Sequence, residues 1–366
     1  MIKIKISILI GSLSGGGAER VVCNLANYLV SKNHEVTIIT MSAQQTYTID
    51  ERVKHVILFD DSQNKSNFII KNAKRILNLR KYFKKEKPDV YMTFLPTLSY
   101  TMLSHRKLIK CPIILAERCE PSIYCESEKN KKRLLKFYPK ADAFVFQTKD
   151  AKKYYNEQLN LKKPYEIVIP NAINEEFIGK KYDGERKKTI VAAGRMSQQK
   201  NFGLLIRSFA NVKDMFHEYN LKICGDGPLL ESHKELAKSL GIGERVEFPG
   251  YVKNISEQIK DASLFVLSSN YEGMPNALME AMALGLPCIS TNCPCGGPEF
   301  LIENGKNGLL VSVNDEEMMT KAIKKVLEDN ELAKQMGENA SKICETLAPE
   351  KIYAQWEEFI NKVVKM

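Results

Sequence analysis

Short apolar runs alternate with amphipathic helical periods along almost the whole chain, and this alternation limits the folds available to it. In the first half, the runs expected to form strands are IKISILIG, EVTIIT, VKHVILF, DVYMTF, PIILAE and AFVFQT. Between several of them lie stretches with helical spacing, such as AERVVCNLANYLVSKN and residues 68–86. Strands that alternate with helices in this way predict a parallel, doubly wound sheet.

A polar, charged stretch over residues 166–188 interrupts the pattern, and a second alternating series follows it. The strands expected there are TIVAAGR, LKICGDG, VEFPGY, LFVLSS, PCIST and GLLVSV. We therefore expect an α/β protein with two Rossmann-like, doubly wound domains facing a central cleft, over residues 1–168 and 169–348. In open sheets of this kind, ligands bind beyond the carboxyl ends of the strands. Candidate site residues should therefore follow strands directly.

The composition indicates a globular protein of two domains. The chain has 366 residues, of which 44% are hydrophobic and 27% charged, and no apolar run approaches the roughly 20 residues that cross a bilayer. The first residues alternate in polarity and run into a glycine loop, which favours a strand over a signal peptide. The nine cysteines show no paired zinc spacing, so we expect reduced thiols in a cytoplasmic protein.

Charge is divided unevenly between the two expected domains. Residues 1–168 contain 30 Lys and Arg against 16 Asp and Glu, whereas the remainder contains 24 against 28. The basic excess is concentrated in residues 71–87 and 129–137, where apolar residues are interleaved at helical spacing. A solvated helix face and a surface that meets an anionic membrane explain these runs equally well. No motif typical of nucleic-acid binding is present, and we expect no nucleic-acid partner.

The glycine loop GSLSGGGAER (11–20) follows the first expected strand and opens the first helix. It matches neither the dinucleotide-binding G-x-G-x-x-G pattern nor the P-loop pattern. The backbone N–H groups around Gly16 and Gly17 could still face an anion at the helix N-terminus. A tight turn without a ligand explains the same residues.

Two cations follow the first strand of the second series. In VAAGRMSQQKNF (191–202), Arg195 comes directly after the strand, and Lys200 lies at the start of the next helix. Arg offers a bidentate fork and Lys a mobile point charge, and both suit a diphosphate whose negative charge grows as a bond breaks. Two surface cations in a basic protein are the plainer interpretation.

Two glutamates flank a Gly-Met-Pro-Asn turn in YEGMPNALMEAMALGLPCIS (271–290). Glu272 lies in the loop after LFVLSS, and Glu280 lies inside the apolar helix that begins near Pro275. A carboxylate within such a helix needs partners, and ribose hydroxyls would supply them. Glu272 and the N–H groups of residues 273–276 would then reach a sugar. An isolated pair at this spacing is also compatible with a Glu280 that faces solvent.

Taken together, these motifs resemble the retaining GT-B glycosyltransferases of the family-4 type, which build polysaccharides and glycolipids from nucleotide sugars. The resemblance extends over nearly the whole chain, through SGGGAERVVCNLANYL, IPNAIN, AGRMSQQKNF, ICGDGPLL, FPGYVKN, EGMPNALMEAMALGLPCIS and NGKNGLLV. It implies that the first domain serves the acceptor and the second binds the nucleotide-sugar donor. The last helix, over about residues 349–366, is then expected to pack back on the first domain.

The resemblance also implies roles for individual residues. Arg195 and Lys200 would hold the diphosphate, Glu280 the ribose and Glu272 the transferred sugar, so the catalytic set is Glu272, Arg195 and Lys200. The donor-binding set implied is Gly16, Gly17, Arg195, Lys200, Tyr251, Asn254, Glu272, Gly273, Met274, Pro275, Asn276 and Glu280. No Asp-x-Asp triplet occurs in the sequence, which favours an enzyme that needs neither a metal nor another cofactor.

One segment departs from the family pattern. Many relatives carry a histidine where this chain has LAERCEP, with Glu117 and Arg118. Either residue is a candidate for contact with the acceptor or the donor sugar, and a salt-bridged pair is an equally good interpretation. The departure favours relatives that build lipid-linked capsular, exopolysaccharide or O-antigen units, at the inner face of the membrane.

The expected reaction transfers a hexose or N-acetylhexosamine from a nucleotide diphosphate sugar to a hydroxyl of a glycan or lipid-linked glycan. The donor is expected to be UDP-linked, and the anomeric configuration is expected to be retained. Front-face attack is favoured, because the sequence offers no second carboxylate placed for a double displacement. Two alternatives stay open at this point. One is a nucleotide-sugar-binding protein without catalysis, and the other is a nucleotide-sugar epimerase of the same fold.

Overall fold

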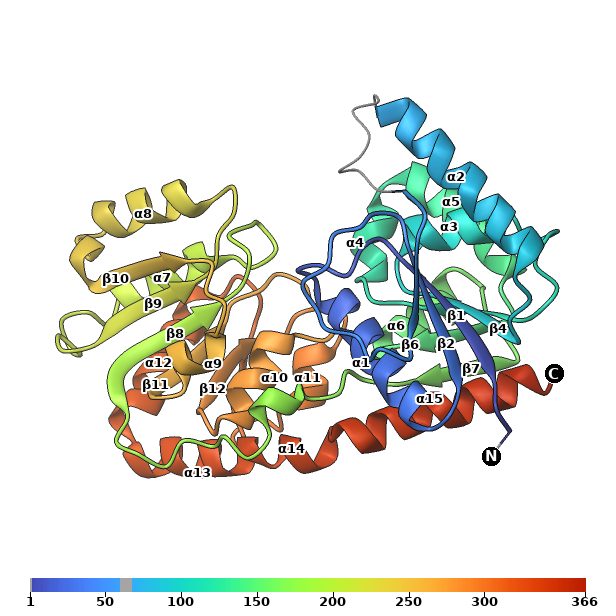
Figure 1. The fold of residues 1–366 in the computed structure, drawn as a ribbon. Helices are drawn as coiled ribbons and strands as arrows, with labels where there is room; N and C mark the ends of the chain where they lie inside the picture. Colours follow the sequence, from blue (N-terminus) through green and yellow to red (C-terminus); the bar gives the residue numbers. More distant parts are fainter. Residues whose placement is uncertain (1, 60–67) are drawn as a thin grey trace. The chain divides into compact units, whose positions relative to one another are not determined.

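The computed structural model describes residues 2–59 and 68–366, which form two compact units. Unit 1 comprises Met1–Ala172 and Glu350–Met366, and unit 2 comprises Ile173–Pro349. Each unit is a parallel sheet covered by helices (Figure 1). The first segment of unit 1 runs to Ala172, and Asn171 near its end accepts a hydrogen bond from Arg118.

The sheet of unit 1 has seven parallel strands in the order β3-β2-β1-β4-β5-β6-β7. Its strands are β1 (Lys5–Ile10), β2 (Glu35–Thr40), β3 (Lys54–Ile57), β4 (Val90–Thr93), β5 (Ile113–Ala116), β6 (Ala143–Phe146) and β7 (Tyr165–Val168). Its helices are α1 (Gly17–Ser31), α2 (Phe68–Lys85), α3 (Pro96–Ser104), α4 (Pro121–Glu126), α5 (Glu128–Phe137), α6 (Lys149–Lys153) and α15 (Pro349–Val364). β4, β5 and β6 are buried along their whole length, as expected for strands covered on both faces.

The sheet of unit 2 has six parallel strands in the order β10-β9-β8-β11-β12-β13. Its strands are β8 (Lys187–Ala193), β9 (Asn220–Cys224), β10 (Val246–Gly250), β11 (Ala262–Leu267), β12 (Cys288–Thr291) and β13 (Leu309–Val311). Its helices are α7 (Phe202–Ala210), α8 (Leu230–Ser239), α9 (Ile255–Ile259), α10 (Asn276–Ala283), α11 (Gly297–Leu301), α12 (Glu316–Glu328), α13 (Asn330–Ser341) and α14 (Ile343–Thr346).

The strand order creates one switch point in each sheet. In unit 2 the chain proceeds from β8 through β9 to β10 and then returns to the other side of β8 as β11. The loops after β8 and β11 therefore leave the sheet in opposite directions, which is where open α/β sheets bind ligands. In unit 1 the corresponding point lies between β1 and β4, so the glycine loop after β1 borders it.

One expected helix is shorter than the sequence suggested. Helical spacing over residues 201–216 predicts one long helix, but α7 ends at Ala210. The guanidinium of Arg245 binds the backbone oxygens of Lys213, Phe216 and Tyr219, at distances of 2.6–3.1 Å. These bonds hold the segment as a series of turns, since its carbonyls are satisfied without a continuing helix.

The last helix belongs to unit 1 by its packing. The buried residues of α15 recur at helical spacing, and they include Trp356 and Tyr353. The Trp356 ring stacks on Phe94 with 5.7 Å between ring centres, and Tyr353 meets Tyr28 of α1 at 5.6 Å. The carboxylate of Glu357 accepts hydrogen bonds from His34 and Tyr28. The chain thus ends on the domain where it begins.

Candidate active site

The loops after β8 and β11 are bound to one another at the switch point of unit 2. The backbone N–H of Asn270 donates to the Gln199 oxygen at 2.8 Å, and its side-chain amide donates to the Gln198 oxygen. The hydroxyl of Ser268 donates to the Lys200 oxygen at 2.9 Å. Arg195 is exposed in the first of these loops. The two loops therefore form one rigid platform at the carboxyl edge of the sheet.

Lys200 and Glu272, distant in sequence, meet on this platform. The Lys200 ammonium lies 2.5 Å from Oε1 of Glu272, and both side chains are largely buried. The hydroxyl of Ser269 donates to the same Oε1 at 2.6 Å. Glu272 is 6% exposed, so its charge is compensated inside the protein by one cation and one hydroxyl. The sequence predicted Lys200 and Glu272 as site residues but gave no sign that they pair.

Glycines allow the loops around this pair to approach closely. A Cβ atom on Gly194 would lie 3.0 Å from Cε of Lys200, so the lysine stem runs directly across that glycine. A Cβ on Gly225, after β9, would lie 1.9 Å from the Gly194 oxygen. Both residues have positive φ angles, which only glycine adopts easily. Backbone proximity therefore positions Lys200 against the sheet edge.

The backbone of Glu272 is held from its other side by the loop after β12. Its N–H donates to the Pro294 oxygen at 2.6 Å, and its carbonyl accepts from the Cys295 N–H at 2.7 Å. The thiol of Cys293 in this loop is buried. Burial, and then the nearby Glu272 carboxylate, raise its pKa to about 12. This thiol is therefore neutral, and it acts as packing rather than as a nucleophile.

The Gly-Met-Pro-Asn turn leads directly into α10. Gly273, Met274 and Pro275 precede the helix, and Asn276 is its first residue. Glu280 lies in the helix interior and is 7% exposed. The interpretation in which Glu280 faces solvent is therefore wrong, because the apolar helix around it is itself buried in the unit.

Two further donor-site candidates follow β10. Tyr251 is 77% exposed directly after the strand, so its ring is available to a ligand. Asn254 caps α9: its oxygen accepts from the Ser256 hydroxyl at 2.7 Å and from the Glu257 N–H at 3.5 Å. Asn254 therefore has a structural role that the sequence did not indicate.

In unit 1, Gly16 and Gly17 form the start of α1, which Gly16 caps. The carboxylate of Glu19 folds back over this cap, since a Cβ on Gly16 would lie 1.8 Å from its Oε2. An anion at these N–H groups would therefore have to displace the Glu19 side chain.

Glu117 and Arg118 do not form the salt bridge that the sequence left open. The two oxygens of Glu117 accept from the hydroxyls of Tyr138 and Tyr155, each at 2.8 Å. Burial raises the pKa of Glu117 and outweighs these hydrogen bonds. Arg118 turns away and donates from Nη1 to Oδ1 of Asn171 at 2.8 Å. The buried Glu117 therefore has a structural role in the interior of unit 1, which the sequence did not indicate.

Sequence reasoning missed the hydroxyl residues that fix the platform. Ser268 and Ser269 are fully buried, and Thr291 at the end of β12 donates to the Ser269 oxygen at 2.6 Å. A signal was present, because LFVLSS and PCIST both end in hydroxyl residues at the carboxyl end of a strand. Such residues satisfy the loop carbonyls where the sheet ladder stops.

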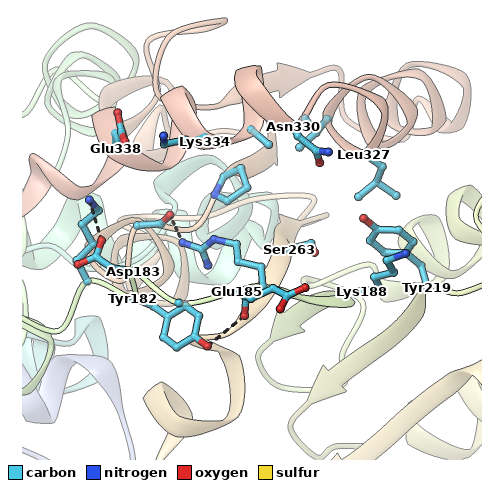
Figure 2. A pocket seen from close by; sticks show the side chains of 17 residues that line it. Tyr182, Asp183, Glu185, Lys188, Tyr219, Ser263, Leu327, Asn330, Lys334 and Glu338 are labelled. Carbon is cyan, nitrogen blue, oxygen red and sulfur yellow. Dashed lines mark hydrogen bonds and ion pairs between the residues drawn. The ribbon is translucent and has the colours of Figure 1, made fainter.

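A separate pocket of about 460 Å³ lies at the opposite, amino edge of the unit 2 sheet (Figure 2). It is lined by residues that precede or begin strands, such as Tyr219 and Ser263, and by Lys334 of α13. Within it, Arg186 donates to the backbone oxygens of Lys260, Ala262 and Gly285. None of the predicted site residues lines this pocket. Arg186 instead ties the amino ends of the strands together.

Two features bear on metals and membranes. Among residues 2–59 and 68–366, no group of three His, Cys, Asp or Glu side chains is arranged to hold a metal ion. Within the same ranges, no helix combines the length and the apolar character that crossing a bilayer requires.

Comparisons with known proteins cover both units. Residues 15–177 match the model of Glycosyltransferase Family 4, and residues 174–343 match that of Glycosyl transferases group 1. One relative is an α-1,4-N-acetyl-D-galactosaminyltransferase of Campylobacter jejuni that acts on an undecaprenol-diphosphate-linked glycan. It is 30% identical to this chain, and the match covers 98% of this chain and 99% of the relative. The amylovoran biosynthesis glycosyltransferase AmsD of Erwinia amylovora is 27% identical, with coverage of 98% of this chain and 99% of the relative.

Solved structures agree with this assignment at the level of the fold. Sucrose-phosphate synthase of Thermosynechococcus elongatus superposes with a TM-score of 0.83 at 18% identity, over 98% of both chains. The HepE protein of Anabaena, determined in complex with UDP and glucose, superposes with a TM-score of 0.82 at 16% identity, over 98% of this chain and all of that one. The two parallel sheets, the platform at the switch point and these matches together place the chain in the family-4 glycosyltransferases of GT-B fold.

Proposed function

We propose that this glycosyltransferase moves a hexose or N-acetylhexosamine from a UDP-linked donor to a hydroxyl of a lipid-linked glycan, with retention of configuration and without a metal. The proposed setting is capsular, exopolysaccharide or O-antigen synthesis at the cytoplasmic face of a membrane. The Lys200–Glu272 pair at the switch point of unit 2 carries the proposal. A buried cation and carboxylate on a rigid edge provide fixed partners for a diphosphate and a sugar.

In the proposed donor complex, the exposed Arg195 and the ammonium of Lys200 bind the diphosphate. Glu280 binds the ribose, and Tyr251 lies against the base.

The sugar site is centred on Glu272. Oε1 of Glu272 already accepts from Lys200 and Ser269. Oε2 has no partner among the described residues, and it would accept a hydrogen bond from the transferred sugar. The N–H groups from Gly273 to Asn276 complete the sugar site.

The proposed step breaks the bond between the anomeric carbon and the diphosphate oxygen and forms a bond to the acceptor oxygen on the same face. The acceptor proton passes to the departing phosphate oxygen, and the nucleoside diphosphate leaves. Negative charge grows on that phosphate, so Arg195 and Lys200 stabilise the transition state more than the ground state. Such preorganised charge is worth roughly 10²–10³ in turnover for one donor.

The relatives support the choice of substrates. The Campylobacter enzyme is named for transfer of N-acetylgalactosamine to an undecaprenol-diphosphate glycan, and the HepE structure contains UDP and glucose. We extend both substrate classes to this chain as part of the proposal. Unit 2 is then the donor domain, and unit 1 serves the acceptor.

A thermal-shift panel of UDP-, GDP- and ADP-sugars tests the donor, because a bound donor raises the melting temperature in proportion to its affinity. A UDP-sugar should raise it most, and the Arg195→Ala variant should lose most of that shift. UDP release should then require a lipid-linked acceptor. The product should have the same anomeric configuration as the donor sugar, which the coupling of the anomeric proton in NMR spectra measures. An inverted product would reject the retaining mechanism, and UDP-sugar turnover without any acceptor would favour an epimerase.

A basic surface on unit 1 supports the proposed membrane setting. The helix α2 carries exposed Arg80, Lys81, Lys84 and Lys85, together with the exposed apolar side chains of Ile76 and Leu77. Each Lys or Arg near an anionic leaflet contributes about 1 kcal/mol to attraction. Exposed apolar groups among them can enter the headgroup region.

Sedimentation with vesicles tests this surface. We expect binding to anionic vesicles at low salt, release at high salt and little binding to neutral vesicles. Changing Arg80, Lys81, Lys84 and Lys85 to Glu should abolish binding. The same change at exposed Lys234, Lys238, Lys325 and Lys334 of unit 2 is the matched control. Equal binding to both vesicle types would contradict the electrostatic account, and binding to neither would favour a soluble acceptor.

A further inference from the structure

Arg118 occupies an unusual position at the carboxyl edge of the unit 1 sheet, two residues beyond β5. Its guanidinium carbon lies 5.2 Å from the ring centre of Phe94 and 5.3 Å from that of Trp356. The Nη1 group donates to Asn171 at 2.8 Å. The guanidinium is therefore stacked by two aromatic rings and held at one end, so its orientation is fixed.

The other edge of this guanidinium is unsatisfied. Nε and Nη2 are buried and have no hydrogen-bond partner among the described residues. Three other partly buried arginines differ: Arg106 binds the Asp142 carboxylate and two backbone oxygens, and Arg186 and Arg245 bind backbone oxygens. Leaving a buried donor unpaired costs roughly 1–3 kcal/mol. Nε and Nη2 together form the fork that binds a carboxylate or phosphate through two parallel bonds.

Two other buried polar atoms at this sheet edge also lack partners in the described part of the chain. They are Oγ1 of Thr93, the last residue of β4, and Oε2 of Glu120, the residue that caps α4. β4 and β5 are neighbours, so both atoms belong to the edge from which Arg118 extends. A hydroxyl and a carboxylate oxygen suit sugar hydroxyls, and the arginine fork suits an oxyanion.

From these observations we infer that Arg118 binds an oxyanion of the acceptor through Nε and Nη2, with Glu120 and Thr93 bonding adjacent hydroxyls. The identification of this ligand as the acceptor rests on the proposed function. The acceptor is therefore an anionic glycan, whose charge is a phosphate or a sugar carboxylate. Burial lowers the pKa of Arg118 to about 10, which still leaves the guanidinium charged at neutral pH.

The chain contains a single tryptophan, and it is the one that stacks on Arg118. An anion on the fork changes the field across the Trp356 ring, so fluorescence should report occupancy directly. The Arg195→Ala/Lys200→Ala double variant serves as background, because it removes the proposed donor phosphate site. Inorganic pyrophosphate and glucuronate are titrated in turn at constant ionic strength, which separates a phosphate ligand from a carboxylate ligand.

We expect a saturable change in Trp356 emission with at least one of the two anions. Arg118→Gln should abolish the change, and Arg118→Lys should weaken binding about tenfold because it keeps the charge but loses the fork. Arg133→Gln, at an exposed arginine of α5, is the control with the same loss of charge and should bind as the parent does. Circular dichroism confirms that each variant is folded.

The absence of a saturable change with both anions would overturn the inference, because the fork would then bind neither a phosphate nor a carboxylate. An equal response in Arg118→Lys and the parent would overturn it too. Failure of the proposed function has a different signature. In that case UDP-sugars would not stabilise the protein, whereas the Trp356 response to the anion would persist.

Discussion

The carboxyl edges of the two sheets differ in how their polar groups are satisfied. In unit 2, the Lys200 ammonium and the Ser269 hydroxyl both donate to Oε1 of the Glu272 carboxylate. The loops that carry them are further joined by backbone bonds. The protein itself therefore holds these groups in place.

At the same edge of unit 1, the Arg118 fork, Oγ1 of Thr93 and Oε2 of Glu120 lack partners among the described residues. The difference indicates two ways of preparing a site. In the proposed mechanism, unit 2 fixes charges that must be in place for bond cleavage, because reorganising them during the reaction would raise the barrier. Unit 1 holds polar groups whose hydrogen bonds a ligand would supply, which favours selection of that ligand.

The largest expected effect is at the preorganised edge. Replacing Arg195 with Ala should lower turnover about 10²-fold while leaving the melting temperature unchanged, because the side chain is exposed. Lys200→Ala should lower turnover at least as much, and it should also lower the melting temperature, since it leaves the buried Glu272 without its counter-ion. Arg207→Ala, which removes an arginine bonded to Glu316, is the matched control. Near-parental turnover in Arg195→Ala would remove that residue from the mechanism.

The role of Ser269 can be isolated by a double-mutant cycle. Ser269→Ala should lower turnover about tenfold with little change in UDP affinity, because it frees the Glu272 carboxylate from one of its two restraints. In the Glu272→Gln background the same change should have little further effect, because both variants disturb one group. Ser290→Ala, a buried hydroxyl on β12 that bonds only the Thr291 oxygen among the described residues, is the control. Additive losses in the cycle would show that Ser269 acts independently of Glu272.

The buried carboxylate in α10 should affect binding rather than the chemical step. Glu280→Gln should weaken UDP binding at least about tenfold, because a hydrogen bond to a charged group contributes about 1.5–3 kcal/mol and every 1.4 kcal/mol is tenfold. Turnover at saturating donor should change less, because ribose contacts are equal in the ground and transition states. Isothermal titration with UDP measures the effect. UDP binding as tight as in the parent would exclude the ribose role.

The smallest effect concerns Glu117, the buried acid of unit 1. Burial raises its pKa, so between its ordinary and raised pKa the folded protein binds a proton that the unfolded chain releases. The free energy of unfolding should therefore fall as pH rises through this window. Glu117→Gln should remove this pH dependence, and Trp356 fluorescence reports the unfolding of unit 1. If the free energy of unfolding depended on pH equally in Glu117→Gln and the parent, Glu117 would not be the source of the pH dependence. Glu126→Gln, at an exposed glutamate, is the control.

The sequence alone determined the strands that border the site and the loops that carry it. TIVAAGR and LFVLSS became β8 and β11, and Arg195 and Glu272 follow them as expected. These features could be predicted because hydrophobic periodicity and turn residues act over a few neighbouring positions. The family could be recognised for the same reason, since its motifs are short and each follows a strand.

Only the tertiary structure decided which side chains meet. Lys200 and Glu272 pair because β8 and β11 are neighbours in the sheet. In the sequence, the strands β9, β10 and β11 lie between the two loops that carry them. Glu117 turns to Tyr138 and Tyr155 rather than to Arg118, and Trp356 of the last helix reaches Arg118. Such contacts depend on how whole elements pack. No local pattern encodes the distance between two side chains that are far apart in the chain.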